Sequence, residues 1–140
     1  MSKPVRVLLI EDNPADADLT KETLESGRIL VDIMVATNGA EALAQLKHRD
    51  TLATPLPDLI LLDLNLPRID GRHVLREIKK DNELRRIPVV ILTSSDAERD
   101  IVQSYELGAN CYVTKPVGLQ AFQSIVRSLE GFWLSVVRLP

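Results

Sequence analysis

The strongest indication of the fold is the segment Pro57-Asp58-Leu59-Ile60-Leu61-Leu62-Asp63-Leu64-Asn65-Leu66-Pro67. Its continuous apolar run, residues 59–62, is flanked by prolines, which is typical of a short strand buried on both faces of a sheet. Asp63 follows this run directly, so the strand would deliver one carboxylate at its C-terminal end. Ligands of open parallel sheets bind at the carboxyl ends of the strands. The sequence therefore predicts a functional carboxylate at position 63.

Four further segments have the composition of strands, and they cover residues 5–10, 31–36, 87–92 and 110–114. Segments with helical spacing separate them, and strands that alternate with helices predict parallel βαβ units. Five such units fit a flavodoxin-like, doubly wound α/β sheet with strand order 2-1-3-4-5 and helices on both faces. We expect a single domain over residues 1–140.

Local signals predict where several helices begin and end. Asn13 stands before a proline and is expected to cap the first helix, which Gly27 would end in a left-handed conformation. Asp70 is expected to cap the helix after the central strand. Ile101 and Tyr105 are expected to share one face of the next helix. The last helix has the clearest apolar spacing, at Phe122, Ile125, Val126, Leu129 and Trp133.

Composition excludes several classes of function. The 140-residue chain is 45% hydrophobic and 26% charged, with a formal net charge of −3, so it has no basic character that would favour nucleic acid or an anionic membrane. Cys111 is the single cysteine, which excludes an internal disulfide and favours a reducing, cytoplasmic setting. No apolar run approaches the ~20 residues of a transmembrane helix, and the N-terminal residues lack the features of a signal peptide.

Polar groups are expected to gather at one edge of this sheet, because the C-terminal ends of the first, third, fourth and fifth strands share that edge. The groups are Glu11, Asp12, Asp63, Thr93 and Lys115. Two carboxylates near 4 Å repel by about 4 kcal/mol at an effective dielectric of ~20, and one lysine does not offset three of them. A divalent cation with oxygen ligands does, and Mg²⁺ suits a site of few carboxylates with retained waters.

The same set of groups suits phosphoryl transfer. A metal ion and Lys115 would neutralise the phosphoryl oxygens, and the Thr93 hydroxyl would hydrogen-bond one of them. Asp63 would be the nucleophile that forms an acyl phosphate.

The sequence resembles the receiver domain of two-component response regulators over essentially its whole length. The matching motifs are Glu11-Asp12, Asp63 at a strand end, residues 63–71 (DLNLPRIDG), Thr93-Ser94 and Lys115-Pro116. The resemblance implies that Asp63 accepts a phosphoryl group from a partner histidine kinase and that the domain switches a protein-interaction surface. It implies slow loss of the phosphoryl group rather than turnover as an enzyme.

The resemblance also implies individual roles. Asp12 and Asp63 would bind Mg²⁺ directly, together with the backbone carbonyl of Asn65, and Glu11 would bind it through water. Lys115 would pair with Asp63 and later with the phosphoryl group, and Pro116 would follow a cis peptide bond. The remaining implied pair is a switch, in which Thr93 moves toward the phosphoryl group and Tyr112 swings inward.

Two features set this chain apart from most receiver domains. Val117-Gly118 follows the Lys-Pro pair, where most members have Phe. The C-terminal segment, residues 131–140, is long and apolar, and apolar patches commonly mark interfaces, so we expect a homodimer. With the Asn65-Leu66-Pro67 motif, these features resemble the single-domain regulators of cyanobacterial and other bacterial phytochromes, which implies a light-sensing kinase as partner.

Three other interpretations stay open at this point. An aspartate-nucleophile phosphohydrolase of the haloacid-dehalogenase type needs a second acid two residues after the nucleophile, where this chain has Asn65. Flavin or nucleotide binding needs a loop rich in Gly, Ser or Thr after the first strand, whereas Glu11 and Asp12 would repel a phosphate. A degenerate receiver would act by protein contact alone.

Overall fold

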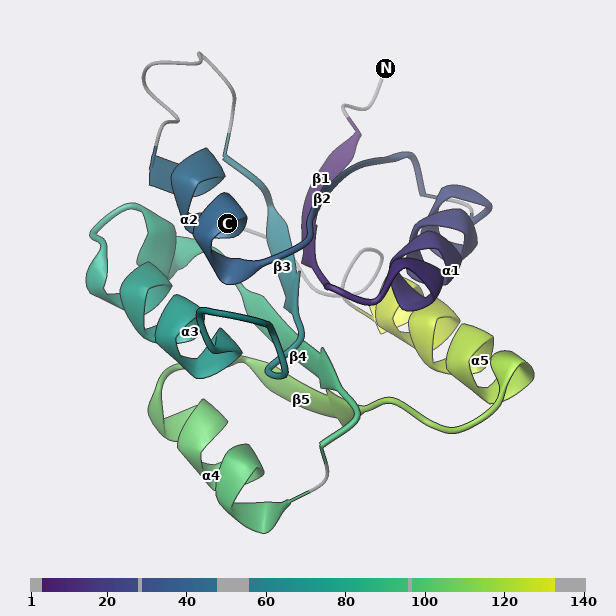
Figure 1. Ribbon diagram of the computed structural model, residues 1–140. Coiled ribbons are helices and arrows are strands. Elements are labelled where there is room, and N and C mark those ends of the chain that lie inside the picture. The colour runs from purple at the N-terminus through teal and green to yellow at the C-terminus, as the bar shows by residue number, and fades with distance from the viewer. Residues whose placement is uncertain (1–3, 28, 48–55, 96, 133–140) are drawn as a thin grey trace.

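The computed structural model describes residues 4–27, 29–47, 56–95 and 97–132. A parallel five-stranded sheet lies at its centre, with strand order β2-β1-β3-β4-β5 (Figure 1). The strands are β1 Val5–Ile10, β2 Val31–Ala36, β3 Leu59–Leu62, β4 Val89–Thr93 and β5 Cys111–Thr114. The helices are α1 Pro14–Glu25, α2 Gly39–Lys47, α3 Gly71–Lys80, the short 3₁₀ helix η1 Leu84–Arg86, α4 Glu98–Glu106 and α5 Leu119–Leu129. The predicted topology and helix order are confirmed.

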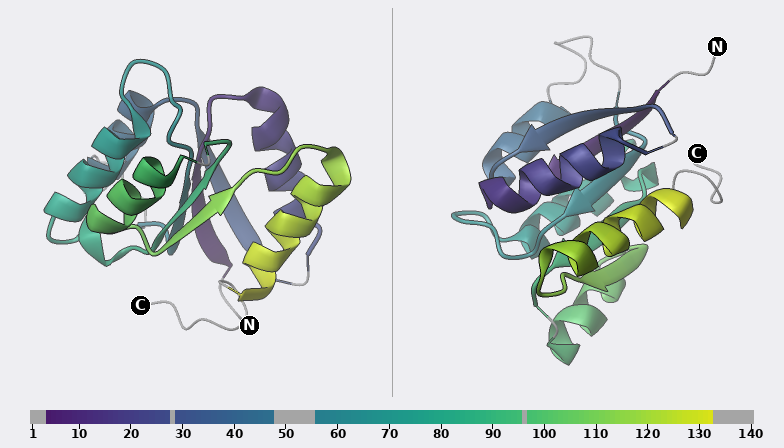
Figure 2. Two further views of the ribbon diagram at one scale, coloured as in Figure 1. Left: turned by 90° about the horizontal axis from the view of Figure 1, so that it is seen from below. Right: turned by 90° about the vertical axis from the view of Figure 1, so that its right-hand side faces the viewer.

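Helices cover both faces of the sheet, with α1 and α5 on one side and α2, α3 and α4 on the other (Figure 2). All four residues of β3 are buried, and they divide between two separate hydrophobic clusters. Ile60 and Leu62 belong to the cluster that contains the apolar residues of α2 and α3, whereas Leu59 and Leu61 belong to the cluster with those of α1 and α5. A strand with an apolar layer on each face needs an unbroken apolar sequence, which explains the run at residues 59–62.

Side-chain capping fixes helix starts near the sheet edge as predicted. Asn13 accepts a hydrogen bond from the backbone N–H of Asp16 at 3.1 Å, and Asp70 accepts one from the N–H of Arg72 at 2.7 Å. Gly71, the first residue of α3, lies directly against the segment that follows β3: a Cβ atom there would lie 2.4 Å from the Asp63 carbonyl oxygen. A glycine is therefore required for this close approach.

Two local predictions are wrong, and a third needs qualification. Gly27 does not take the left-handed conformation expected of it, since the described glycines with positive φ are Gly108 and Gly118; α1 ends instead at Glu25, and the N–H of Ser26 bonds back to the Glu22 carbonyl. Ile101 and Tyr105 lie four residues apart in α4 and so share one side of it, but Tyr105 is 49% exposed and Ile101 is half-buried, so this side is not the buried one. The fourth strand begins at Val89, because the segment before it forms the turn of η1.

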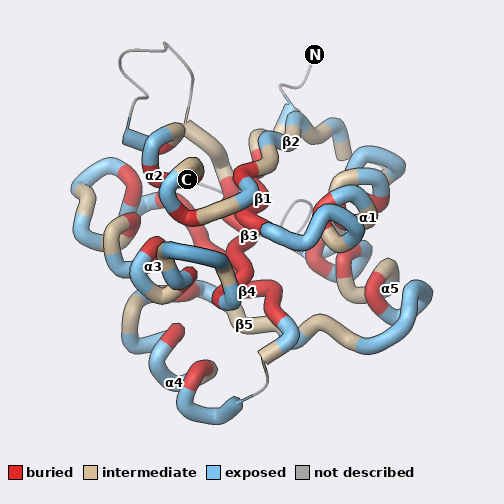
Figure 3. Tube along the Cα trace, in the orientation of Figure 1, coloured by how far each residue is buried: buried red, intermediate tan, exposed pale blue. Residues whose placement is uncertain are grey.

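Figure 3 shows the buried residues concentrated along the strands and on the inner faces of the helices. No helix in the described residues has the length and apolarity to cross a membrane. Trp133 and most of the apolar C-terminal segment lie outside the described residues. Phe132, at the end of the described chain, is 54% exposed.

Candidate phosphoryl-acceptor site

The strand register brings the predicted polar residues to one edge of the sheet. Ile10 of β1 is level with Leu62 of β3, and Leu62 is level with Ile91 of β4. Backbone bonds continue this alignment past the strand ends, from the Asp63 N–H to the Ile10 carbonyl at 3.0 Å and from the Lys115 N–H to the Thr93 carbonyl at 2.7 Å. The side chains that follow the strands therefore converge at one point.

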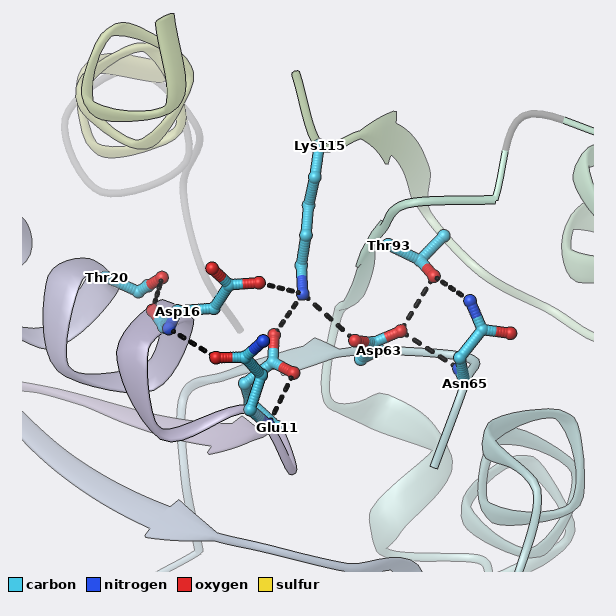
Figure 4. Close-up of polar contacts among 8 residues, drawn as sticks. Glu11, Asp16, Thr20, Asp63, Asn65, Thr93 and Lys115 are labelled. Atoms are coloured by element: carbon cyan, nitrogen blue, oxygen red, sulfur yellow. Dashed lines mark hydrogen bonds and ion pairs between the residues drawn. The ribbon is translucent and has the colours of Figure 1, made fainter. Parts of the chain in front are cut away.

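Asp63 lies where these side chains meet, and its relative exposure is 6% (Figure 4). Its Oδ1 accepts hydrogen bonds from the Thr93 hydroxyl at 2.7 Å and from the Asn65 N–H at 2.9 Å. Its Oδ2 accepts one from the Lys115 ammonium at 3.0 Å. Burial acts to raise the pKa of Asp63, but these bonds and the Lys115 charge outweigh it and hold that pKa below its usual value. Asp63 is therefore a fixed, ionised carboxylate.

Lys115 reaches the site from the end of β5 and is the cation that contacts three carboxylates. Its Nζ donates to Glu11, to Asp16 at 3.0 Å and to Asp63 at 3.0 Å. Burial opposes its charge, yet these carboxylates raise the pKa of Lys115 above its usual value. The ammonium therefore lies between Asp63 on one side and Glu11 and Asp16 on the other (Figure 4).

Glu11 is buried beside Asp63, with a relative exposure of 3%. Burial raises the pKa of Glu11 to about 7, against the hydrogen bond from Lys115. The neighbouring charge of Asp63 acts in the same direction as burial. Lys115 alone therefore does not compensate both carboxylates fully.

The carboxylates fit the predicted divalent-metal site. Ligand oxygens of Glu11, Asp12 and Asp63 all lie within 4.8 Å of one another, and Asp12 is exposed to solvent whereas the other two are buried. Lys115 does not balance the negative charge of these carboxylates fully. Carboxylate oxygens are the ligands that hard divalent cations prefer. These residues could hold such an ion with an open side toward solvent.

The predicted switch residues lie in the neighbouring strands β4 and β5. The Thr93 hydroxyl is buried against Asp63 and also accepts a hydrogen bond from the Asn65 side-chain amide at 3.4 Å. Tyr112 is half-buried, its ring packs against the cluster on the α3 side, and its hydroxyl donates to the Ser95 carbonyl at 2.7 Å. Both residues are thus joined to the segment between β4 and α4.

The prediction of a cis peptide bond before Pro116 is wrong, because no peptide bond among the described residues is cis. Trans is the intrinsically preferred form of an X-Pro bond by about 0.5–1 kcal/mol. The Lys115 N–H already pairs with the Thr93 carbonyl, so the β-ladder places Lys115 without a cis bond.

Sequence reasoning missed two groups that contact the site or its surroundings. Asp16, in the first turn of α1, supplies a third carboxylate to Lys115. The available signal was that this capped helix begins directly after the acidic pair Glu11-Asp12, so an acid in its first turn lies near the same sheet edge. Asp100 is buried at 8% exposure and pairs with Arg72 of α3. No local pattern indicated that pairing, because the two residues are 28 positions apart.

Comparison with known proteins agrees with this geometry. The family described as "Response regulator receiver domain" matches residues 7–127. The chain belongs to this family. Response regulator Rcp1 of Synechocystis sp. is 46% identical to this receiver domain over 138 residues, which are 98% of this chain and 94% of Rcp1.

Solved structures of receiver domains show the same fold. The crystal structure of the Mn²⁺-bound form of Rcp1 superposes with a TM-score of 0.93 at 46% identity, over 98% of this chain and 99% of that one. The phosphorylated cyanobacterial phytochrome response regulator RcpA superposes with a TM-score of 0.94 at 45% identity, over 99% of both chains. The predicted family and fold are therefore confirmed.

Proposed function

We propose that Asp63 of this receiver domain accepts a phosphoryl group from the phosphohistidine of a partner kinase. One observation carries the proposal: the side chains of Lys115 and Thr93 contact Asp63, and the carboxylates of Glu11 and Asp12 lie beside it. An ionised carboxylate with one oxygen held by Thr93 and the other by Lys115 is a fixed nucleophile beside two donors for a phosphoryl group.

In the reaction, a carboxylate oxygen of Asp63 attacks phosphorus, and the P–N bond to the kinase imidazole breaks. The electron pair of that bond stays on the imidazole nitrogen, and an acyl phosphate forms on Asp63. Lys115 and Thr93 are close enough to donate hydrogen bonds to the transferred oxygens. A bound divalent cation would neutralise charge on the phosphoryl oxygens.

We propose Mg²⁺ as that cation, held by Asp12 and Asp63 with the backbone carbonyl of Asn65, and by Glu11 through water. The carboxylate cluster supports this assignment, as does the Mn²⁺-bound form of Rcp1. Asn65 has a second consequence: its amide is no general base, and it occupies the place where a phosphohydrolase needs an acid. The acyl phosphate should therefore be lost slowly, not turned over.

Intact-mass measurement after incubation with acetyl phosphate tests this proposal. The wild type should gain one phosphoryl group only when Mg²⁺ is present, and Asp63→Asn should gain none. Asp18→Asn serves as the matched control because Asp18 is an exposed carboxylate on α1. Adduct formation on folded Asp63→Asn would contradict the assignment. No adduct on the wild type, from acetyl phosphate or from a kinase, would favour a degenerate receiver, and continuous phosphate release would favour a phosphohydrolase.

We further propose a phytochrome-type histidine kinase as the partner, because the similar proteins Rcp1 and RcpA are response regulators and RcpA is described as a phytochrome response regulator. Transfer of radiolabelled phosphate from a purified bacterial phytochrome kinase tests this partner. Transfer that depends on illumination and on Asp63 is expected. Labelling by acetyl phosphate without transfer from the phytochrome would reject the partner and keep the chemistry. We place this reaction in the cytoplasm.

We also propose that the domain forms a homodimer. Apolar side chains are exposed near α4 and α5, namely Val102, Tyr105, Val117, Leu119 and Phe132. Size-exclusion chromatography with light scattering, with and without acetyl phosphate, tests this proposal. A monomeric mass at all concentrations would contradict it.

A further inference from the structure

Helix α4 is held to the rest of the fold differently from the other α-helices. Each of the others buries at least two apolar side chains: Ala17 and Leu24 on α1, Ala42, Leu43 and Leu46 on α2, Val74, Leu75 and Ile78 on α3, and Phe122, Val126 and Leu129 on α5. The buried residues of α4 are both polar, Asp100 and Ser104. Figure 3 shows most of α4 exposed. Apolar burial therefore contributes little to the position of this helix.

Asp100 supplies the contact that replaces apolar anchoring. One of its carboxylate oxygens accepts a hydrogen bond from Arg72 of α3, and the other accepts one from the Ser95 hydroxyl. Arg72 is fixed in turn, because its second terminal nitrogen donates to both oxygens of Asp70 at 3.0 Å. We refer to Arg72, Asp100 and Ser95 as the α3–α4 clasp. It joins two helices and the segment that precedes α4.

The clasp is connected to the acceptor site through Ser95. Ser95 is two residues beyond Thr93, whose hydroxyl donates to Asp63 at 2.7 Å. The Ser95 carbonyl accepts the Tyr112 hydroxyl at 2.7 Å. The N–H of Tyr112 donates to the Tyr105 hydroxyl of α4 at 3.1 Å. Ser95 is therefore held by its side chain toward Asp100 and by its carbonyl toward β5.

We infer that Arg72 and Asp100 are positioning residues for the phosphoryl-acceptor site, acting through Ser95 on the segment that carries Thr93. A segment already held in its binding arrangement loses less conformational freedom when a phosphoryl group arrives than a loose one does. The clasp thus couples the contact between α3 and α4 to the affinity of the site for a phosphoryl group. This inference rests on the proposed acceptor role of Asp63.

Beryllofluoride is a suitable probe, because it occupies an aspartate as a phosphoryl mimic without the later hydrolysis step. Its affinity in Mg²⁺ buffer would be measured by isothermal titration calorimetry for the wild type and for Arg72→Ala, Asp100→Ala and the double variant. Ser95→Ala removes only a hydroxyl from a loop segment, and it provides a test that does not risk the fold. Arg76→Ala is the matched control, since Arg76 is an exposed arginine on α3.

Each clasp variant should bind beryllofluoride at least about fivefold more weakly than the wild type, the lower range of coupling between sites. The double variant should be no weaker than the weaker single variant, because both changes break the same contact. A merely structural role would lower the unfolding temperature and leave the beryllofluoride affinity of the folded variants unchanged. Affinities of folded Asp100→Ala and Ser95→Ala within about twofold of the wild type would overturn the inference.

If Asp100→Ala does not fold, the Ser95→Ala affinity decides alone. A failure of the underlying function gives a different result. Wild-type protein that binds no beryllofluoride, or binds it equally well as Asp63→Asn, would overturn the acceptor role and the inference with it.

Discussion

Replacing Lys115 by methionine should strongly destabilise the metal-free protein. The Lys115 ammonium donates to Glu11, Asp16 and Asp63, and its side chain is only 7% exposed. Methionine fills a similar linear space without charge, so the change removes charge compensation while largely preserving packing. The carboxylates then face one another without their shared cation.

The contacts set the expected magnitude. Removing one partner of a buried ion pair costs about 3–5 kcal/mol, because the other charge stays buried. Two features place this variant at the lower end: the Asp16 side chain is 31% exposed, and burial already raises the pKa of Glu11 to about 7, so Glu11 can bind a proton once the ammonium is gone. We expect a loss of about 3 kcal/mol. For a domain of this size the unfolding midpoint should fall by roughly 6–12 °C.

Thermal unfolding followed by circular dichroism, in chelator and then in Mg²⁺, measures this effect. Mg²⁺ at about 100 times the wild-type dissociation constant adds about 2.7 kcal/mol to the wild type by mass action. The same Mg²⁺ concentration should add more to Lys115→Met, because no ammonium competes with the ion and the variant should bind it more tightly. Lys80→Met is the control, since its side chain is 69% exposed and 3.9 Å from Glu77, and should change stability by less than about 0.5 kcal/mol. A Lys115→Met midpoint within about 2 °C of the wild type in chelator would show that the carboxylates do not depend on this ammonium for stability.

Three further predictions concern the same edge of the sheet. Burial raises the pKa of Glu11 from 4.5 to about 7, so its stabilising contribution in the metal-free protein is complete below its unfolded pKa and is lost as pH rises through about 7. In urea unfolding with chelator, the free energy of unfolding of Glu11→Gln should therefore increase relative to that of the wild type as pH rises. A difference that stays constant with pH would contradict this. Gly71→Ala places a Cβ atom 2.4 Å from the Asp63 carbonyl oxygen and should lower the free energy of unfolding by about 1–3 kcal/mol, whereas an unchanged urea midpoint would show that the α3 start relaxes freely. Asp16→Asn removes one of the negative charges that hold Lys115, at a partly exposed position, so stability should change by less than about 1 kcal/mol. Adduct formation with acetyl phosphate, followed by intact mass, should become faster; a slower reaction would mean that Asp16 positions Lys115 productively.

Local chemistry explains why much of the fold was accessible from the sequence. The apolar run at residues 59–62 requires two apolar layers, whatever those layers contain, and both are present. Asn13 and Asp70 cap helices through bonds that span two or three residues, so their neighbours along the chain are sufficient to predict them. The strand order then places the ends of β1, β3, β4 and β5 at one edge, and with it Asp63 beside Lys115.

The five-unit α/β architecture and the residue types that meet at the sheet edge follow from the sequence, because periodicity, caps and strand ends are properties of neighbouring residues. Which carboxylates share Lys115 depends on the three-dimensional packing, since Asp16 and Glu11 are 99 and 104 positions from it. Packing also sets which side of α4 faces inward. That side carries Asp100, which pairs with Arg72, and not Ile101 and Tyr105. Helical spacing alone does not distinguish a buried ion pair from an exposed one. That difference depends on the partner that another helix brings within reach.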